Sequence, residues 1–214
     1  MKEKLILFDW GNIVESHITG YTCFDAWNEL FKACGYLGNE SAFNIINEYN
    51  LQCISTFENL KNAYDNIARK YNFKTSYLEF TELYKKIFDK IDYYENVAQY
   101  EKSLNDRCYI GIFSNLTLLD KDRLNKQVDL SQYDYVFLSF EMGCQKPEKE
   151  IFEKVNEKLP FCNKNILFID DSQDNIDIAN KIGWNTQKAT GLELEKIKLC
   201  CENFIGGIKC PNGV

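Results

Sequence analysis

The stretch Leu5-Ile6-Leu7-Phe8-Asp9-Trp10-Gly11-Asn12 decides the fold. Its first four residues form an unbroken apolar run, which is typical of a strand buried on both faces of a parallel sheet. Asp9 ends this run, and Gly11 and Asn12 follow it with the composition of a tight turn. An aspartate at this place can simply cap the turn. The carboxyl ends of parallel strands are, however, also where open α/β sheets bind their ligands, so Asp9 is the first candidate functional residue.

Further strands are predicted outward from this stretch, and polar residues follow three of them. The three strands are residues 108–113, followed by Ser114-Asn115; 135–138, followed by a loop that reaches Lys146; and 166–169, followed by Asp170-Asp171. Residues 184–189 form a last strand. Because helical patterns separate these strands, we predict a doubly wound α/β core with a parallel, Rossmann-like sheet.

Capping and stop signals place the helices of this core. Pro147 suits the first turn of a helix that runs to Leu159, and Gly183 ends a helix that begins at Ser172. Residues 190–193 form a capping box, in which the hydroxyl of Thr190 and the carboxylate of Glu193 satisfy the first free amides of a helix. They therefore predict the start of a last helix. Further helices are predicted over 95–104 and 118–126.

Residues 15–94 have helical patterning and almost no strand-like run, which indicates an inserted helical domain. Capping boxes at 55–58 and 76–79 each start a helix. Apolar residues at helical spacing give these two helices and two more a core-facing stripe: Phe57, Leu60, Tyr64, Ile67 and Tyr71; Phe80, Tyr84, Ile87, Phe88 and Ile91; Phe24, Trp27, Leu30 and Phe31; Phe43, Ile46 and Tyr49. We therefore predict a core domain of residues 1–14 and 95–214 and an all-α domain of residues 15–94.

Composition excludes two classes of partner. The 214 residues are 45% hydrophobic with a net charge of −7, and no cluster of Lys and Arg suits a nucleic-acid backbone. No apolar stretch is long enough to cross a membrane, and residues 1–4 lead into the first strand without a secretory leader. We therefore expect a cytoplasmic protein, a monomer or weak dimer, that binds neither nucleic acid nor membrane.

The nine cysteines are expected to be reduced thiols, because their number is odd, their spacing is irregular and no CxxC pair occurs. Cys200, Cys201 and Cys210 form a cluster that could bind a metal. This cluster lacks both paired ligand spacing and a nearby histidine, so the sequence favours thiols without a ligand role.

The polar strand ends should converge, because parallel strands present their carboxyl ends at one edge of the sheet. Asp9, Asp170 and Asp171 would repel one another there unless a hard cation joined them, and ligation by oxygen atoms is the preference of Mg²⁺. Lys146 and Ser114-Asn115 would add a cation, a hydroxyl and backbone amides, which suit a dianion such as phosphate. The sequence therefore predicts a site for Mg²⁺ and a small phosphorylated metabolite.

Four segments resemble, in their usual order, the motifs of the haloacid dehalogenase superfamily. They are residues 8–12, 113–115, 145–148 and 170–175. The turn at Gly11-Asn12, residues 138–143 and residues 174–176 are similar to the α-glucose-1-phosphatase branch, and the helical insertion resembles the C1 cap of that family. The resemblance implies a phosphatase that acts on a small metabolite such as a sugar-1-phosphate.

The resemblance also implies roles for individual residues. Asp9 would be the nucleophile, which forms an aspartyl-phosphate, and Lys146 would neutralise both Asp9 and the phosphate. Ser114 and the amide of Asn115 would hold phosphoryl oxygens. The metal ligands would be Asp9, the carbonyl of Gly11, Asp171, and Asp170 directly or through water.

One position departs from most phosphatases of the superfamily, which carry a second aspartate two residues after the nucleophile as general acid and base. This chain has Gly11 there, as the α-glucose-1-phosphatase branch does. The departure leaves two alternatives open: a dehalogenase or phosphonatase-like hydrolase, and a catalytically weak protein that binds a phosphorylated ligand. His17, the only histidine, is a candidate substitute base or an ordinary surface or core residue.

Overall fold

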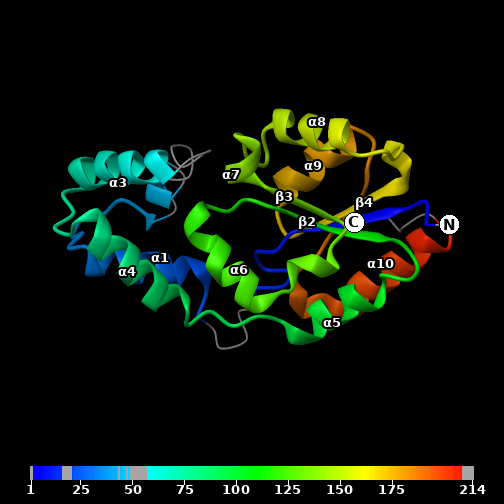
Figure 1. Cartoon of the computed structure of the whole chain (residues 1–214), viewed down its shortest axis with the longest axis horizontal. Helices are drawn as coiled ribbons and strands as arrows, with labels where there is room; N and C mark the ends of the chain where they lie inside the picture. Colours follow the sequence, from blue (N-terminus) through cyan, green and yellow to red (C-terminus); the bar gives the residue numbers. More distant parts are fainter. Residues whose placement is uncertain (1, 16–20, 43, 47, 49–56, 209–214) are drawn as a thin grey trace.

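A five-stranded parallel sheet forms the centre of the computed structural model, which describes residues 2–15, 21–42, 44–46, 48 and 57–208 (Figure 1). The strand order is β3-β2-β1-β4-β5, and every neighbouring pair is parallel. The strands are β1 Leu5–Phe8, β2 Tyr109–Ser114, β3 Tyr135–Leu138, β4 Ile166–Asp170 and β5 Asn185–Lys188. The predicted doubly wound α/β fold is thus confirmed.

Strand β1 lies in the middle of the sheet because all four of its residues are apolar and fully buried. Phe8 is in register with Ile112 of β2 and Ile169 of β4. The amide of Asp9 donates to the carbonyl of Ile169 at 2.9 Å, which extends the pairing by one residue. The ends of these three strands therefore lie side by side.

Helices cover both faces of the sheet (Figure 1). Ile6 and Phe8 point to one face, where they join an apolar cluster with α5 Glu95–Ser103, α6 Lys121–Gln127 and α10 Leu194–Ile205. Leu5 and Leu7 point to the other face and pack with α8 Lys149–Lys158 and α9 Gln173–Lys181. The alternation of side chains along one strand thus supplies two separate cores.

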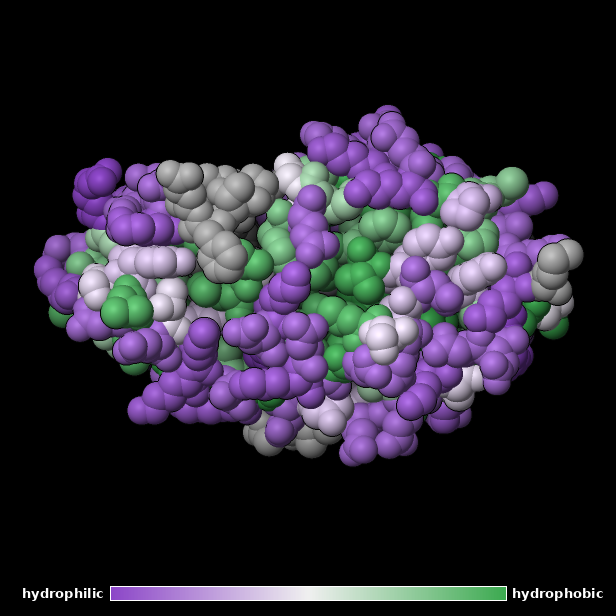
Figure 2. All heavy atoms as spheres, viewed as in Figure 1, coloured by the Kyte–Doolittle hydropathy of each residue, from purple (hydrophilic) through white to green (hydrophobic). Residues whose placement is uncertain are grey.

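Short elements connect these layers: the helix α7 Ser139–Met142 and the 3-10 turns η1 Leu118–Asp120, η2 Leu130–Gln132, η3 Asn163–Asn165 and η4 Gly191–Glu193. The capping box at 190–193 begins η4, which leads into α10 as predicted. Figure 2 shows hydrophilic residues over most of the viewed face, with hydrophobic residues gathered toward its middle. Among the described residues, no helix is both long and apolar enough to cross a membrane.

The helices α1 Cys23–Ala33, α3 Phe57–Tyr71 and α4 Tyr77–Phe88 lie beyond one end of the sheet and share a third apolar cluster (Figure 1). Thr22 with Asp25, and Ser76 with Glu79, form complete capping boxes at the starts of α1 and α4. The residues 54–56 before α3 and the side chains of Phe43 and Tyr49 are outside the described part. The division into residues 15–94 and the remainder stays a prediction.

Two sequence-based placements are wrong. Pro147 is not in the first turn of α8: the helix begins at Lys149, because residues 145–148 form a turn that is closed by a bond from the Glu148 amide to the Gln145 carbonyl. Phe24 does not belong to the buried stripe of α1. It is 45% exposed and lines the cavity that is described below.

Glu101 is fully buried on α5, where Tyr133 donates a hydrogen bond of 2.6 Å to one carboxylate oxygen. The other oxygen has no partner within the described part of the chain. Burial raises the pKa of Glu101 from 4.5 to about 8, against the opposing effect of the Tyr133 bond. The folded state therefore binds more protons than the unfolded state between these pH values, and stability falls as the pH rises through this range.

We expect Glu101→Gln to match the wild type in stability at pH 4 and to exceed it at pH 8.5 by on the order of a few kcal/mol. The amide keeps an acceptor for Tyr133 and removes the buried charge. Urea unfolding at both pH values measures the difference, with exposed Glu157→Gln on α8 as the control. An equal effect at both pH values would contradict this account.

Candidate active site

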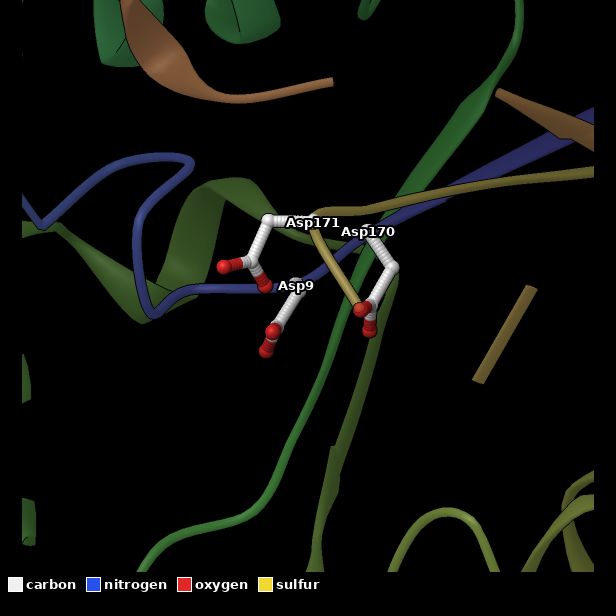
Figure 3. Close-up of side chains that lie close together, drawn as sticks. All are labelled: Asp9, Asp170 and Asp171. Carbon is white, nitrogen blue, oxygen red and sulfur yellow. The ribbon is translucent and has the colours of Figure 1, made fainter. Parts of the chain in front are cut away.

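The carboxylates of Asp9, Asp170 and Asp171 meet at the carboxyl edge of the sheet (Figure 3). One oxygen atom of each lies within 4.8 Å of the others. Asp9 follows β1, and Asp170 and Asp171 lie at the end of the neighbouring strand β4, so the strand register explains their closeness. Asp9 and Asp170 are buried, whereas Asp171 is partly exposed.

Lys146 joins two of these carboxylates from the loop before α8. Its Nζ lies 2.7 Å from Oδ2 of Asp170 and 3.0 Å from Oδ1 of Asp9, and it donates to the carbonyl of Phe113 at 2.8 Å. Burial alone would lower the pKa of Lys146, but the two carboxylates outweigh burial and raise it. The lysine is therefore a fixed positive charge beside Asp9.

The site still carries an excess of negative charge. Burial raises the pKa of Asp9 from 3.8 to about 7; Lys146 opposes this shift, Asp170 and Asp171 add to it, and a hydrogen bond from Ser114 opposes it. One lysine cannot balance three carboxylates, and all the converging donors are oxygen atoms. This donor set fits a hard divalent cation such as Mg²⁺.

Two asparagines that do not belong to the predicted site residues orient the acidic groups. Asn175 of α9 donates from Nδ2 to both oxygens of Asp170 at 3.0 Å, and Asn12 donates to Asp171 at 2.6 Å. Asn12 adopts a left-handed backbone with φ of 58°, a conformation that asparagine tolerates well. The only sequence signal for this orienting role is that Asn12 and Asn175 lie a few residues after Asp9 and after Asp170-Asp171.

Asn115 ties the end of β2 to the lysine loop. Its Nδ2 donates to the carbonyl of Lys146 at 2.7 Å, and its Oδ1 accepts from the amide of Lys146 at 2.8 Å. This reciprocal pair fixes the backbone that carries the lysine. The family resemblance implies a role for the backbone amide of Asn115, and these bonds add a role for its side chain.

A cavity of about 320 Å³ lies over these groups. Six of the predicted site residues line it: Asp9, Gly11, Ser114, Asn115, Lys146 and Asp171. Asp170 is fully buried behind them, and His17 lies outside the described residues. Cys23, Phe24 and Trp27 of α1 line the same cavity, together with Ile46. Residues from the predicted helical domain therefore supply part of its wall.

A second ionic group lines the same cavity and was not predicted. Arg123 of α6 is 6% exposed and forms ion pairs with Glu15 and, at 2.7 Å, with Asp120. Its guanidinium carbon lies 4.5 Å from the ring centre of Trp10 and 5.2 Å from that of Phe88. Burial lowers the pKa of Arg123 to about 9, so the group remains a cation at neutral pH.

Comparisons with known proteins agree with this geometry. The model of the haloacid dehalogenase-like hydrolase family matches residues 6–189. A HAD family enzyme of Bacteroides thetaiotaomicron, bt-2542, has a TM-score of 0.74 at 21% identity, covering 93% of this chain and 99% of its own. The same enzyme was also solved with magnesium and inorganic phosphate, at a TM-score of 0.70, 22% identity and coverage of 89% and 96%.

A more distant relative is the L-2-haloacid dehalogenase of Xanthobacter autotrophicus, solved with chloropropionic acid covalently bound. It has a TM-score of 0.60 at 14% identity, with coverage of 99% of this chain and 85% of its own. These structural likenesses concern the fold, whereas the family model spans most of the sequence, including all four polar strand ends. The chain therefore belongs to the haloacid dehalogenase-like hydrolase family.

Proposed function

We propose that the protein is a Mg²⁺-dependent phosphatase of small phosphorylated metabolites, with sugar phosphates, and sugar-1-phosphates in particular, as the substrate class. The observation that carries the proposal is the contact of Lys146 with both Asp9 and Asp170, within an acidic group whose oxygens lie 4.8 Å or less apart. The Bacteroides enzyme with magnesium and inorganic phosphate bound supports this choice among the activities of the family.

In this proposal Asp9 attacks the phosphorus atom, so that the bond from phosphorus to the leaving oxygen breaks as an aspartyl-phosphate forms. Lys146 balances the charge of Asp9 and of the phosphoryl group, and Ser114 and the Asn115 amide hold phosphoryl oxygens. Asp9, Asp171, the Gly11 carbonyl and Asp170 would hold Mg²⁺, the last directly or through water. Bound there, the cation would neutralise charge on the phosphoryl group. Water then attacks the phosphorus atom of the aspartyl-phosphate, the bond from phosphorus to the Asp9 oxygen breaks, and phosphate leaves with the protons of the water shared between phosphate and solvent, which regenerates the Asp9 carboxylate.

The alternatives within the family are less well supported. A dehalogenase needs no cation, so a cluster of three carboxylates favours the phosphatase. A phosphonatase uses a lysine with a neighbouring histidine from its cap, and His17 is the only histidine of this chain. A protein that binds a phosphorylated ligand without catalysis would share the site but would form no covalent phosphate on Asp9. Trapping that intermediate distinguishes it from a phosphatase.

Hydrolysis of an aryl phosphate during a Mg²⁺ titration tests the proposal. We expect activity to disappear with EDTA and to return with added Mg²⁺, and Asp171→Ala to raise the Mg²⁺ concentration for half activity by roughly 10- to 100-fold. The matched control is Asp177→Ala, an exposed aspartate of α9. Full activity in EDTA would refute a metal-dependent phosphatase.

Gly11 leads to a prediction about leaving groups. Without an acid at this position the leaving oxygen departs with much of its negative charge, and general acid help is worth about 10²- to 10⁴-fold. A sugar-1-phosphate releases a hemiacetal oxyanion, which is less basic than an ordinary alkoxide. We therefore expect glucose-1-phosphate to react faster than glucose-6-phosphate, with a burst before steady turnover.

The variant Gly11→Asp tests this explanation directly. No atom lies within 4 Å of the position of a Cβ at Gly11, so the side chain can be added without a clash. We expect the variant to narrow the difference in reaction rate between glucose-1-phosphate and glucose-6-phosphate. If the wild type prefers the 6-phosphate, another group supplies the proton and the explanation fails.

A further inference from the structure

The charged residues that line the cavity form two groups that differ in their balance. Asp9, Asp171 and Lys146 form the first group, at the proposed phosphoryl position, where Lys146 pairs with Asp9. Glu15, Asp120 and Arg123 form the second group, in which Arg123 pairs with both carboxylates. We call the part of the cavity that this second group lines the distal end.

The cation of the distal end is already occupied. Arg123 pairs with Glu15 and Asp120, and its guanidinium carbon lies within 5.2 Å of the ring centres of both Trp10 and Phe88. All three charged side chains are buried, with exposed fractions of 3% for Glu15, 6% for Asp120 and 6% for Arg123. Truncating or moving this arginine toward a ligand would leave two buried carboxylates without their partner, which is unfavourable.

The carboxylates are also held in place by neutral donors. Asp120 accepts bonds from the amide and hydroxyl of Thr117 at 2.7 and 2.8 Å, and from the hydroxyl of Tyr84. These bonds restrain one carboxylate in front of the cavity without adding positive charge. The formal charges of Glu15, Asp120 and Arg123 therefore sum to one excess negative charge at the distal end.

Within the described part of the cavity lining, no further lysine or arginine balances the negative charge of the distal end. Among the described residues that line the cavity, Arg123 and Lys146 are the only ones that carry a permanent positive charge. The stretches 16–20 and 49–56 of the insertion, together with Phe43 and Asn47, contain neither lysine nor arginine in their sequence. A second anionic group on a substrate would thus meet carboxylates without a counter-charge.

The remaining distal wall is apolar and is built by the insertion. Phe24, Trp27 and Ile46 line the cavity, and Phe24 is 45% exposed although it is a large aromatic residue. An aromatic face next to the carboxylate of Glu15 suits a ligand that has both C–H faces and hydroxyl donors. Asp120 acts on such a ligand through its charge, because its oxygens already accept four bonds. A neutral sugar ring has this combination.

We propose that the distal end selects phosphate monoesters whose leaving group is uncharged and polyhydroxylated, and discriminates against those that carry a second phosphate or a carboxylate. This inference rests on the proposed phosphatase function. It assigns Glu15 and Asp120 as specificity residues and Phe24 as a contact for the sugar face. Arg123 is a positioning residue, since it holds the two carboxylates rather than the substrate.

A pair of substrates that differ only in charge tests the inference. Glucose-1-phosphate and glucuronic acid 1-phosphate differ by a hydroxymethyl group in place of a carboxylate. We expect the first to have a kcat/KM about 10- to 100-fold higher, as repulsion by one unbalanced carboxylate at short range allows. Because the two compounds share the anomeric oxygen, the effect of Gly11 is the same for both.

Glu15→Gln should reduce the ratio of the two kcat/KM values about 10-fold, because it removes one negative charge from the distal end. The substitution keeps the shape of the side chain and leaves Arg123 with Asp120 as its charged partner. Asp120→Asn is a second variant with the same expectation, in case either change impairs folding. Exposed Glu153→Gln on α8 is the matched control and should leave the preference unchanged. Phe24→Ala should raise KM for glucose-1-phosphate, in contrast to Leu37→Ala, a substitution of a 94% exposed residue that does not line the cavity.

Calorimetric binding of both esters to Asp9→Asn separates failure of the inference from failure of the proposed function. Tighter binding of glucose-1-phosphate, without hydrolysis by the wild type, would support the selectivity and refute the phosphatase. Equal kcat/KM and equal binding, or a preference for glucuronic acid 1-phosphate, would overturn the selectivity. Absence of binding of either ester would also overturn it.

Discussion

Asp9→Asn is expected to lower kcat by at least about 10⁴-fold, since an amide oxygen is a poor nucleophile and replacing a nucleophile removes the step that depends on it. The amide fits the same space. Its oxygen can still accept the 2.8 Å bond from the Trp10 amide, and Lys146 keeps its 2.7 Å contact with Asp170. The loss should therefore appear in kcat and not in folding.

Stability measurements separate a chemical loss from a structural one. Burial raises the pKa of Asp9 to about 7, so the wild type without metal loses stability as the pH rises from 4 to 7. The neutral amide removes this loss, and we expect the variant to be at least as stable as the wild type at pH 8 without Mg²⁺. Activity that survives in a folded Asp9→Asn protein would exclude Asp9 as the nucleophile.

Lys146→Met is expected to reduce both activity and stability. It removes the positive charge beside the phosphoryl position, and we expect kcat/KM to fall by about 10²- to 10³-fold as a result. It also leaves Asp9 and Asp170 buried without their shared partner, a change that typically costs about 3–5 kcal/mol. Lys146 opposes the upward shift of the Asp9 pKa, so its loss raises that pKa further, and the destabilisation should be largest above pH 7 and smaller at pH 5.

Urea unfolding of Lys146→Met at pH 5 and pH 8, with and without Mg²⁺, measures these effects. Added Mg²⁺ should restore part of the lost stability, because a cation that binds the carboxylates of the folded state stabilises it. Lys149→Met, three residues away in an exposed ion pair with Glu153, should change stability by less than about 1 kcal/mol. Equal destabilisation at both pH values would point to lost packing instead of unpaired charge.

Much of the fold follows from sequence because its strands are short, unbroken apolar runs. Such runs locate buried strands, and the rule that parallel strands end at one edge brings Asp9, Asp170 and Lys146 together before any coordinates are known. The resemblance to family motifs supplied the chemical roles. Helix boundaries were accurate where a capping box or a glycine marks them, as at Ser76 and Gly183.

Contacts between distant segments could not be predicted in the same way. Arg123 lies between other charged residues on a short helix, a pattern typical of a solvated face. Its burial depends on Glu15 and Trp10, which a local pattern does not place beside it. Two further features likewise depend on how separate elements pack together. These are the pair of hydrogen bonds between the Asn115 side chain and the Lys146 backbone, and the exposure of Phe24.

The place of β1 between β2 and β4 also affects how the protein is made. A ribosome releases β1 first, but one of its edges has no partner until residues 166–169 have been synthesised. The turn after Asp9 is completed later still, because the Asn12 carbonyl accepts its 2.7 Å bond from the amide of Gly191. The nascent chain therefore carries Asp9 in an incomplete environment until Gly191 has been synthesised and can pair with Asn12.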